Sequence, residues 1–325
     1  MAYLDGVATD RDDFIDQVVS FAVQHGGFTA DGTIDLGANP VSGQNYAFGL
    51  VRRLVKDGRY FFIYKANTTS GSSEREIRIW FGGLRTPNFT NHTITEDMAP
   101  DWAILKLPVN YESGFTGHTF FSDGSATHCV LEYAPQRFRM LSLGVCHKYG
   151  AYRGGHYASA TNVPGTTGGA TGVGWSEPIL FDGNSSSART LFWNPDEYNH
   201  GTYLDYYWPY GSGSSMAYQN SGVTTVRSDA TGSTQNFYGL LYFACKNGYN
   251  GRNVTMPIEF FTRQAMEHRV RPFGHIPTVR FVNVGRIAPG QIIDNNWQVF
   301  PACTKLPADV LSRNSGNLGF AFKRV

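Results

Sequence analysis

RYFFIYKA at residues 59–66 and EREIRIWF at residues 74–81 are the two segments that decide the fold class. The first is aromatic and β-branched. In the second, Ile77, Ile79 and Phe81 alternate with charged residues, as they do along a strand. The intervening NTTSGSS consists of turn-forming residues. The two segments therefore predict a β-hairpin with a long loop.

Short segments of the same kind recur along the chain, separated by Gly, Pro, Asn or Ser. Further strands are expected at 102–107, 118–122, 129–133, 137–146, 189–193, 237–245, 258–262, 278–284 and 297–301. The pattern predicts a mainly β (α+β) chain that folds into antiparallel, sandwich-like domains.

One helix is expected, at residues 9–25. Its apolar positions recur at four-residue spacing: Phe14, Val18 and Ala22. Thr9 is the expected N-cap, and aspartates in the first turn suit the positive end of the helix dipole. Glycines at 26–27 would end the helix. This short amphipathic helix precedes all the expected strands.

Composition limits the classes of function. The net charge is +1 and no basic run occurs, so neither nucleic-acid binding nor attachment to an anionic membrane is expected. Charged residues make up only 16% of the chain, whereas aromatic residues make up 14%. Interface cores are poor in charge and rich in aromatic residues. Composition alone leaves two alternatives: surface hidden in an assembly, or a polar surface without charge.

Cysteine and histidine form two adjacent pairs, His128–Cys129 and Cys146–His147. Their spacing fits no standard zinc site, and small buried cysteines on neighbouring strands explain them equally well. No metal and no cofactor is therefore expected. The opening MAYLDG lacks the features of a secretory signal, and no apolar stretch is long enough for a transmembrane helix. Synthesis in the cytoplasm and no membrane span are the expectations.

No nucleophile elbow or phosphate-binding loop appears in the sequence, so no enzyme activity is expected. The most distinctive cluster is YLDYYWPY at 203–210. It supplies the candidate interface or glycan-contact residues Tyr203, Asp205, Tyr206, Tyr207, Trp208 and Tyr210. Aromatic side chains stack on sugars but also fill protein cores and interfaces. The cluster therefore leaves a glycan site and a protein interface as alternatives.

Two domains are expected from the length, although one large β-domain of this size is also allowed. The first, 1–112, would hold the helix and the hairpin, and the second, 113–325, would be β-rich. Within the second, Gly/Thr-rich residues 164–176 and Ser/Thr/Gly-rich residues 211–235 read as long loops. Loops of this length usually serve function or contact partners.

Three segments together resemble a family of virion structural proteins of tailed bacteriophages. The first is MAYLDGVATDRDDFIDQVVSFAVQHGGF at 1–28. The second is PQRFRMLSLGVCHKYGAYRGGHYASA at 135–160. The third, at 274–325, combines I-P-x-V-R, an APGQ turn, W-x-V-F-P and a closing GFAFKRV. The segments cover about a third of the chain and occur in the family's order.

This resemblance implies a non-enzymatic component of the tail tip, baseplate or fibre base of a phage virion. It would act by self-association, as a homo-oligomer, and by binding neighbouring virion proteins. The family carries no catalytic residues to transfer. Two alternatives remain open: a tail protein that binds or depolymerises a host-surface glycan, and a capsid decoration protein. The expected location is the virion tail, after synthesis in the host cytoplasm.

The end of the chain can be interpreted without the family. Pro289-Gly290 predicts a turn between strand 278–284 and a strand around 291–300. Residues 318–325 alternate as a terminal strand, with Phe320 and Phe322 on one side. Such a strand needs a neighbour, either in its own sheet or at the edge of a partner's sheet.

Overall fold

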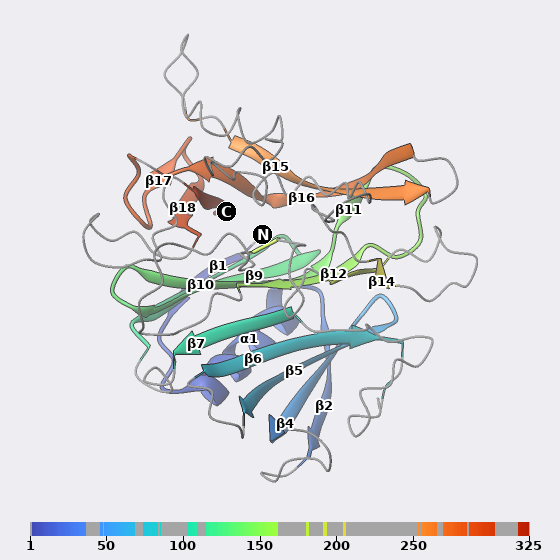
Figure 1. Cartoon of the computed structure of the whole chain (residues 1–325), viewed down its shortest axis with the longest axis vertical. Helices are drawn as coiled ribbons and strands as arrows, with labels where there is room; N and C mark the ends of the chain where they lie inside the picture. The colour runs from blue at the N-terminus through green and yellow to red at the C-terminus, as the bar shows by residue number, and fades with distance from the viewer. Residues whose placement is uncertain are drawn as a thin grey trace, which may run out of the picture.

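Three antiparallel β-sheets lie in layers in the computed structural model, with one helix between two of them (Figure 1). The structure describes residues 2–36, 46–47, 49–68, 74–83, 85, 103–108, 115–161, 180–181, 191–193, 204–205, 253, 255–264, 269–284, 286–302 and 318–324. The expected mainly β, sandwich-like class with an N-terminal helix is confirmed.

The lower sheet of Figure 1 contains the hairpin predicted from residues 59–66 and 74–81. Its strand order is β2-β4-β5-β6-β7, and β3 pairs with β5. The bounds are β2 Thr29–Asp35, β3 Tyr46–Ala47, β4 Leu50–Lys56, β5 Arg59–Thr68, β6 Glu74–Gly82 and β7 Ala103–Pro108. The predicted hairpin is β5–β6, in which Phe61 lies opposite Phe81. Both faces of β6 are buried, because Glu76 and Arg78 form an ion pair of 2.6 Å inside the protein.

The middle sheet has the order β1-β8-β9-β10-β12-β13-β14. The bounds are β1 Ala2–Gly6, β8 Gly117–Ser122, β9 Ala126–Ala134, β10 Arg137–Val145, β12 His156–Ala160, β13 Leu191–Trp193 and β14 Leu204–Asp205. Pairing of β1 with β8 joins the two halves of the chain across the expected 112/113 boundary. Residues 109–114 lie outside the described part, so the boundary itself stays a prediction.

The upper sheet is built around one long strand, β16. Its path is β11-β16-β19-β18-β17, and β15 pairs with the other side of β16. The bounds are β11 His147–Lys148, β15 Thr255–Gln264, β16 Arg269–Asn283, β17 Ile292–Ile293, β18 Trp297–Pro301 and β19 Leu318–Lys323. The terminal strand β19 pairs within its own sheet, between β16 and β18. Phe320 and Phe322 are both fully buried, as their alternation predicts.

The middle sheet buries both of its faces, and this divides the protein into two main cores. Towards the helix and the lower sheet it places Phe120, Cys129, Leu131, Leu141 and Leu143. Towards the upper sheet it places Phe121, Val130, Phe138, Met140 and Tyr157. Each face is apolar because each is covered by another layer.

Helix α1, Arg11–His25, lies between the lower and middle sheets (Figure 1). The expected N-cap at Thr9 is wrong. Asp10 has extended backbone dihedrals and accepts a hydrogen bond from the Asp13 amide at 2.9 Å. The Thr9 amide donates to the Asp13 carboxylate at 2.7 Å, so the two ends of this turn stabilise each other. Phe14 and Phe21 stack on Phe120 of the middle sheet.

Turns explain where the strand predictions deviate. The Ala288 carbonyl accepts from the Gln291 amide at 3.0 Å, and Gly290 has φ +78°, which matches the expected Pro-Gly turn. The single strand expected around 291–300 is wrong. Asp294 and Asn295 adopt positive φ and separate β17 from β18. The expected strand 237–245 lies outside the described residues.

Candidate functional site

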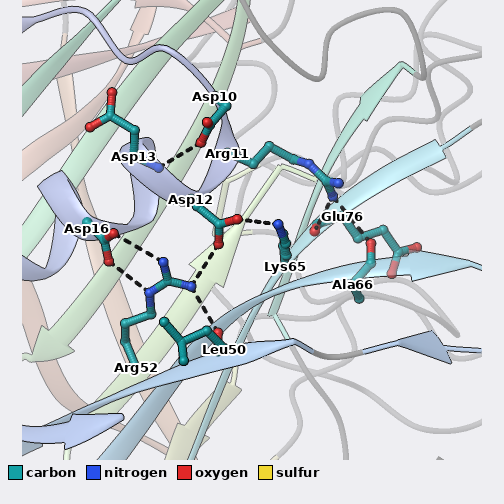
Figure 2. Close-up of polar contacts among 10 residues, drawn as sticks. All are labelled: Asp10, Arg11, Asp12, Asp13, Asp16, Leu50, Arg52, Lys65, Ala66 and Glu76. Atoms are coloured by element: carbon teal, nitrogen blue, oxygen red, sulfur yellow. Dashed lines mark hydrogen bonds and ion pairs between the residues drawn. The ribbon is translucent and has the colours of Figure 1, made fainter. Parts of the chain in front are cut away.

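A cluster of ion pairs covers one side of α1 and fixes it to the lower sheet (Figure 2). The guanidinium of Arg52, from β4, bridges two carboxylates of the helix. Its Nε lies 2.8 Å from Asp16, and its Nη1 lies 2.9 Å from Asp12. Lys65 of β5 donates to the second oxygen of Asp12. The cluster links two strands to successive turns of the helix.

Arg52 is buried, whereas Asp16 is 60% exposed. Burial opposes ionisation of Asp12, but hydrogen bonds from Lys65 and Arg52 outweigh it and hold its pKa below the ordinary value. All the charged groups of this cluster are thus engaged with one another. The aspartates expected to serve helix-end electrostatics also form tertiary ion pairs.

Replacing Arg52 tests how much this cluster contributes to the free energy of unfolding. Arg52→Ala should lower the free energy of unfolding by about 2 kcal/mol, because two carboxylates and the Leu50 carbonyl lose a charged donor. Arg52→Lys keeps the charge but not the two-pronged geometry, and should recover only part of the loss. Urea unfolding measures both. Equal stability of the wild type and Arg52→Ala would contradict the assignment.

A basic residue of the helix itself, Arg11, is directed towards the lower sheet (Figure 2). Its Nη1 donates to the carbonyls of Ala66 and Glu76, at 3.4 and 3.3 Å. These carbonyls belong to β5 and β6, so the first turn of α1 is connected to three strands of the lower sheet, through Arg11 and through the bond from Arg52 to Asp12. The arrangement is structural, because Arg11 is buried.

Lys56, at the end of β4, connects the lower sheet to the helix and to the middle sheet. Its buried ammonium donates to the carbonyls of Gly26, Gly27 and Gly124, at 2.7, 3.3 and 3.0 Å. The first two end helix α1, and the third lies in the turn between β8 and β9. Burial lowers the pKa of Lys56. Carbonyls at the end of the helix and in the middle sheet thus accept hydrogen bonds from one ammonium group of the lower sheet.

A hydrogen-bonded row connects the middle and upper sheets. His128 of β9 bonds through Nδ1 to the Ser142 hydroxyl at 2.7 Å and through Nε2 to the Thr278 hydroxyl at 2.8 Å. The Ser142 hydroxyl also donates to Tyr157 at 3.2 Å. A histidine beside a serine is a nucleophile–base pair when substrate can reach it. Here both side chains are fully buried, so the row joins sheets and has no access to solvent.

The cysteine–histidine pairs do not form a common site. Cys129 and Cys146 are buried, free thiols, and burial raises the pKa of Cys146 to about 12. His147 lies at the surface opposite His275, and its Nε2 is 3.8 Å from Asp123. Among the residues that the structure describes, no group of three or more metal-ligating side chains is arranged to hold an ion.

The N-terminal edge is a surface at the start of the chain where exposed apolar residues and aspartates follow one another closely in the sequence. We use this name for Leu4, Asp5, Val7, Asp10 and Asp13. Leu4 is 50% and Val7 64% exposed. Asp5 accepts from Tyr3 and Thr119, and Asp13 accepts from Thr9 and Gln17. Within the described part of the chain, none of the three carboxylates has a cationic partner within ion-pair distance. No local sequence pattern predicts this edge, because it depends on the pairing of β1 with β8.

The site expected from the sequence lies almost wholly outside the described residues. Tyr203, Tyr206, Tyr207, Trp208 and Tyr210 are not described, and neither are the loops 164–176 and 211–235. The backbone of Asp205 is described, in β14, where it pairs with Phe192 of β13. Strand β14 is the last strand of the middle sheet, and the role of the cluster at 203–210 stays a prediction.

The comparisons with known proteins add no identification: no family model matches this chain, and a search of curated proteins finds no match. Within the described residues, no helix is long and apolar enough to cross a membrane.

Proposed function

We propose that the chain is a non-enzymatic structural component of a tailed-phage virion, placed in the tail tip or baseplate. It would assemble with copies of itself and with neighbouring virion proteins. The resemblance of 1–28, 135–160 and 274–325 to virion proteins is what supports this location. The low proportion of charged residues suits a surface that is largely covered in an assembly.

The use of buried polar groups is the observation that carries the proposal. Lys56 joins the lower sheet to the helix and to the middle sheet. Arg52 joins the helix to the lower sheet, and His128 joins the middle sheet to the upper sheet. Each group uses its hydrogen bonds to hold a sheet to the helix or to a neighbouring sheet. Such cross-links suit a rigid component, which would contribute to an assembly through its shape and the surface area that it buries.

Purified particles of the phage that encodes this chain test the proposal. An antibody against the chain should detect it by blotting of denatured virions, and immunogold should label the distal tail. Gold on the head would favour a capsid decoration protein instead. Absence of the chain from denatured particles, with soluble antigen in the lysate, would overturn the proposal and favour a glycan-active protein.

Deletion of residues 211–235 tests the part of the chain expected to contact partners. The variant should fold with the wild-type circular dichroism spectrum and melting temperature, yet be incorporated into particles less efficiently. Incorporation at the wild-type level would show that this segment does not contact partners in the particle, and would leave the proposed location unaffected.

A further inference from the structure

Strand β1 is an edge of the middle sheet that lacks the features by which edge strands usually avoid a further strand. It pairs with β8 on one side, and no described strand pairs with its other side. Its register with β8 runs without a shift from Ala2 to Gly6, and none of these residues has a positive φ. The strand contains no proline, lysine or arginine. The outward main-chain groups of such a regular edge readily accept another strand.

Other edge strands of the protein are protected in ways that β1 is not. In β2, at the end of the lower sheet, the register shifts between Ala30 and Thr33, and Gly32 has φ +81°. Such a bulge twists an edge away from a further strand. The end strands β14 and β17 contain two residues each. Strand β1 has five residues and no bulge.

The side chains of β1 fit a second copy of the same strand. Antiparallel pairing about a two-fold axis at Leu4 would set Leu4 opposite Leu4, Tyr3 opposite Asp5, and Ala2 opposite Gly6. Directly opposite residues share a face of the sheet. Leu4 is 50% exposed in the single chain, so this axis would bury apolar surface against apolar surface. An axis at Asp5 would instead oppose two carboxylates, which is unfavourable.

Charges are complementary in the register centred on Leu4. The guanidinium of Arg324 lies 3.9 Å from the centre of the Tyr3 ring, and no described carboxylate is within ion-pair distance of it. Asp5 likewise has no cationic partner among the described residues, and accepts hydrogen bonds from Tyr3 and Thr119. Because Tyr3 of one copy would lie opposite Asp5 of the other, the stacked Arg324 would supply the missing cation. The two-fold axis would repeat this contact on its other side.

We propose that two copies of the chain associate by antiparallel pairing of β1 with β1 about a two-fold axis at Leu4. The middle sheets of the two copies then form one continuous sheet. The contact is isologous, so it closes as a dimer and leaves the other surfaces of each copy for further partners. The proposal rests on the proposed function only in taking self-association as the mode of assembly.

Opposite charges at position 4 of the full-length chain test the axis. Leu4→Lys and Leu4→Glu each set like charges opposite each other, and should weaken dimerisation about tenfold or more, measured by sedimentation equilibrium over a concentration series. An equimolar mixture should recover dimerisation, because the introduced lysine then lies opposite the introduced glutamate. Ile292→Lys and Ile292→Glu are the matched controls. Ile292 is 44% exposed on β17, so both should dimerise as the wild type does.

Amide exchange of the wild type tests the pairing without any substitution. The N–H groups of alternate residues in a strand point to the same side, so alternate amides of β1 should exchange about tenfold more slowly in the dimer than in the dilute monomer. The amides of β17, at an edge outside the contact, should exchange at the same rate in both.

Several results would overturn the contact. A wild type that stays monomeric at about 100 µM would do so, because an interface that builds an assembly should form well below that concentration. Self-association that both Leu4 variants leave unchanged would do so as well. The same holds for a mixture that does not recover although each variant melts at the wild-type temperature, and for β1 amides that exchange equally in monomer and dimer. None of these results concerns the presence of the chain in virions, so the particle blot tests the proposed function separately.

Discussion

Acidification from pH 7 to pH 4 should remove about 6 kcal/mol of the free energy of unfolding, which is much of what a typical domain possesses. Two buried histidines are the reason. Burial lowers the pKa of His128 to about 4, and burial also lowers that of His156 to about 4. In the unfolded chain both return to about 6.5. Each group therefore contributes about 3 kcal/mol across this difference of pKa.

The sign of this pH dependence follows from whether the folded or the unfolded state binds more protons. Above the unfolded pKa both histidines are neutral in both states, so stability there does not depend on them. As the pH falls from about 6.5 to about 4, the unfolded chain takes up protons that the folded protein excludes, and stability is lost. Below about pH 4 the loss from these two groups is complete.

Urea unfolding at a series of pH values measures this effect. His156→Gln keeps a side-chain donor for the Lys56 carbonyl, which Nε2 of His156 contacts at 3.1 Å, but does not titrate in this range. This variant should lose about half of the pH dependence, and His156→Gln combined with His128→Asn should lose most of it. A double variant with the wild-type slope would show that other groups dominate the acid response.

Lys56→Met should lower the free energy of unfolding by about 4 kcal/mol. Methionine fills a similar volume, so the main change is the loss of the ammonium that satisfies three buried carbonyls. Amide exchange should accelerate at the end of α1 and in the turn between β8 and β9, because Lys56 donates hydrogen bonds to both.

Lys65→Met is the matched control. Lys65 has the same side chain and also bonds α1, through Asp12, but it is one-third exposed. Exposed ion pairs contribute little, so this variant should lose less than about 1 kcal/mol. If the two variants lost equal stability, the three carbonyls around Lys56 would not be the cause.

Local patterns in the sequence predict the hairpin, the helix and the terminal strand. β5 and β6 are aromatic and β-branched, and α1 carries apolar residues at four-residue spacing. The pattern does not predict strands β2 and β4, whose sequences differ from those of β5 and β6. β2 reads TADGTID, with a glycine and two aspartates, and β4 reads LVRRLVK. Neither alternates cleanly, because β2 is largely exposed and the basic residues of β4 serve tertiary contacts.

The functional features depend on partners far apart in the sequence, and local patterns do not predict such contacts. Lys56 meets carbonyls 30 and 68 positions away, and His128 meets Thr278 across 150 positions. The N-terminal edge arises because β1 pairs with β8, more than a hundred residues along the chain. The tyrosine cluster at 203–210 is distinctive in composition, yet nothing local to it indicates what it faces.

The middle sheet has a consequence for how its strands find their register. In a sheet with one solvent-exposed face, a register shift of one residue moves apolar side chains into water, and the resulting cost in free energy disfavours the wrong register. Here both faces are apolar, so the same slip would exchange the contents of the two cores and expose little. The polar row of His128, Ser142 and Thr278 is satisfied in one register only, since its members come from β9, β10 and β16. These few hydrogen bonds therefore specify an alignment that hydrophobicity alone leaves ambiguous.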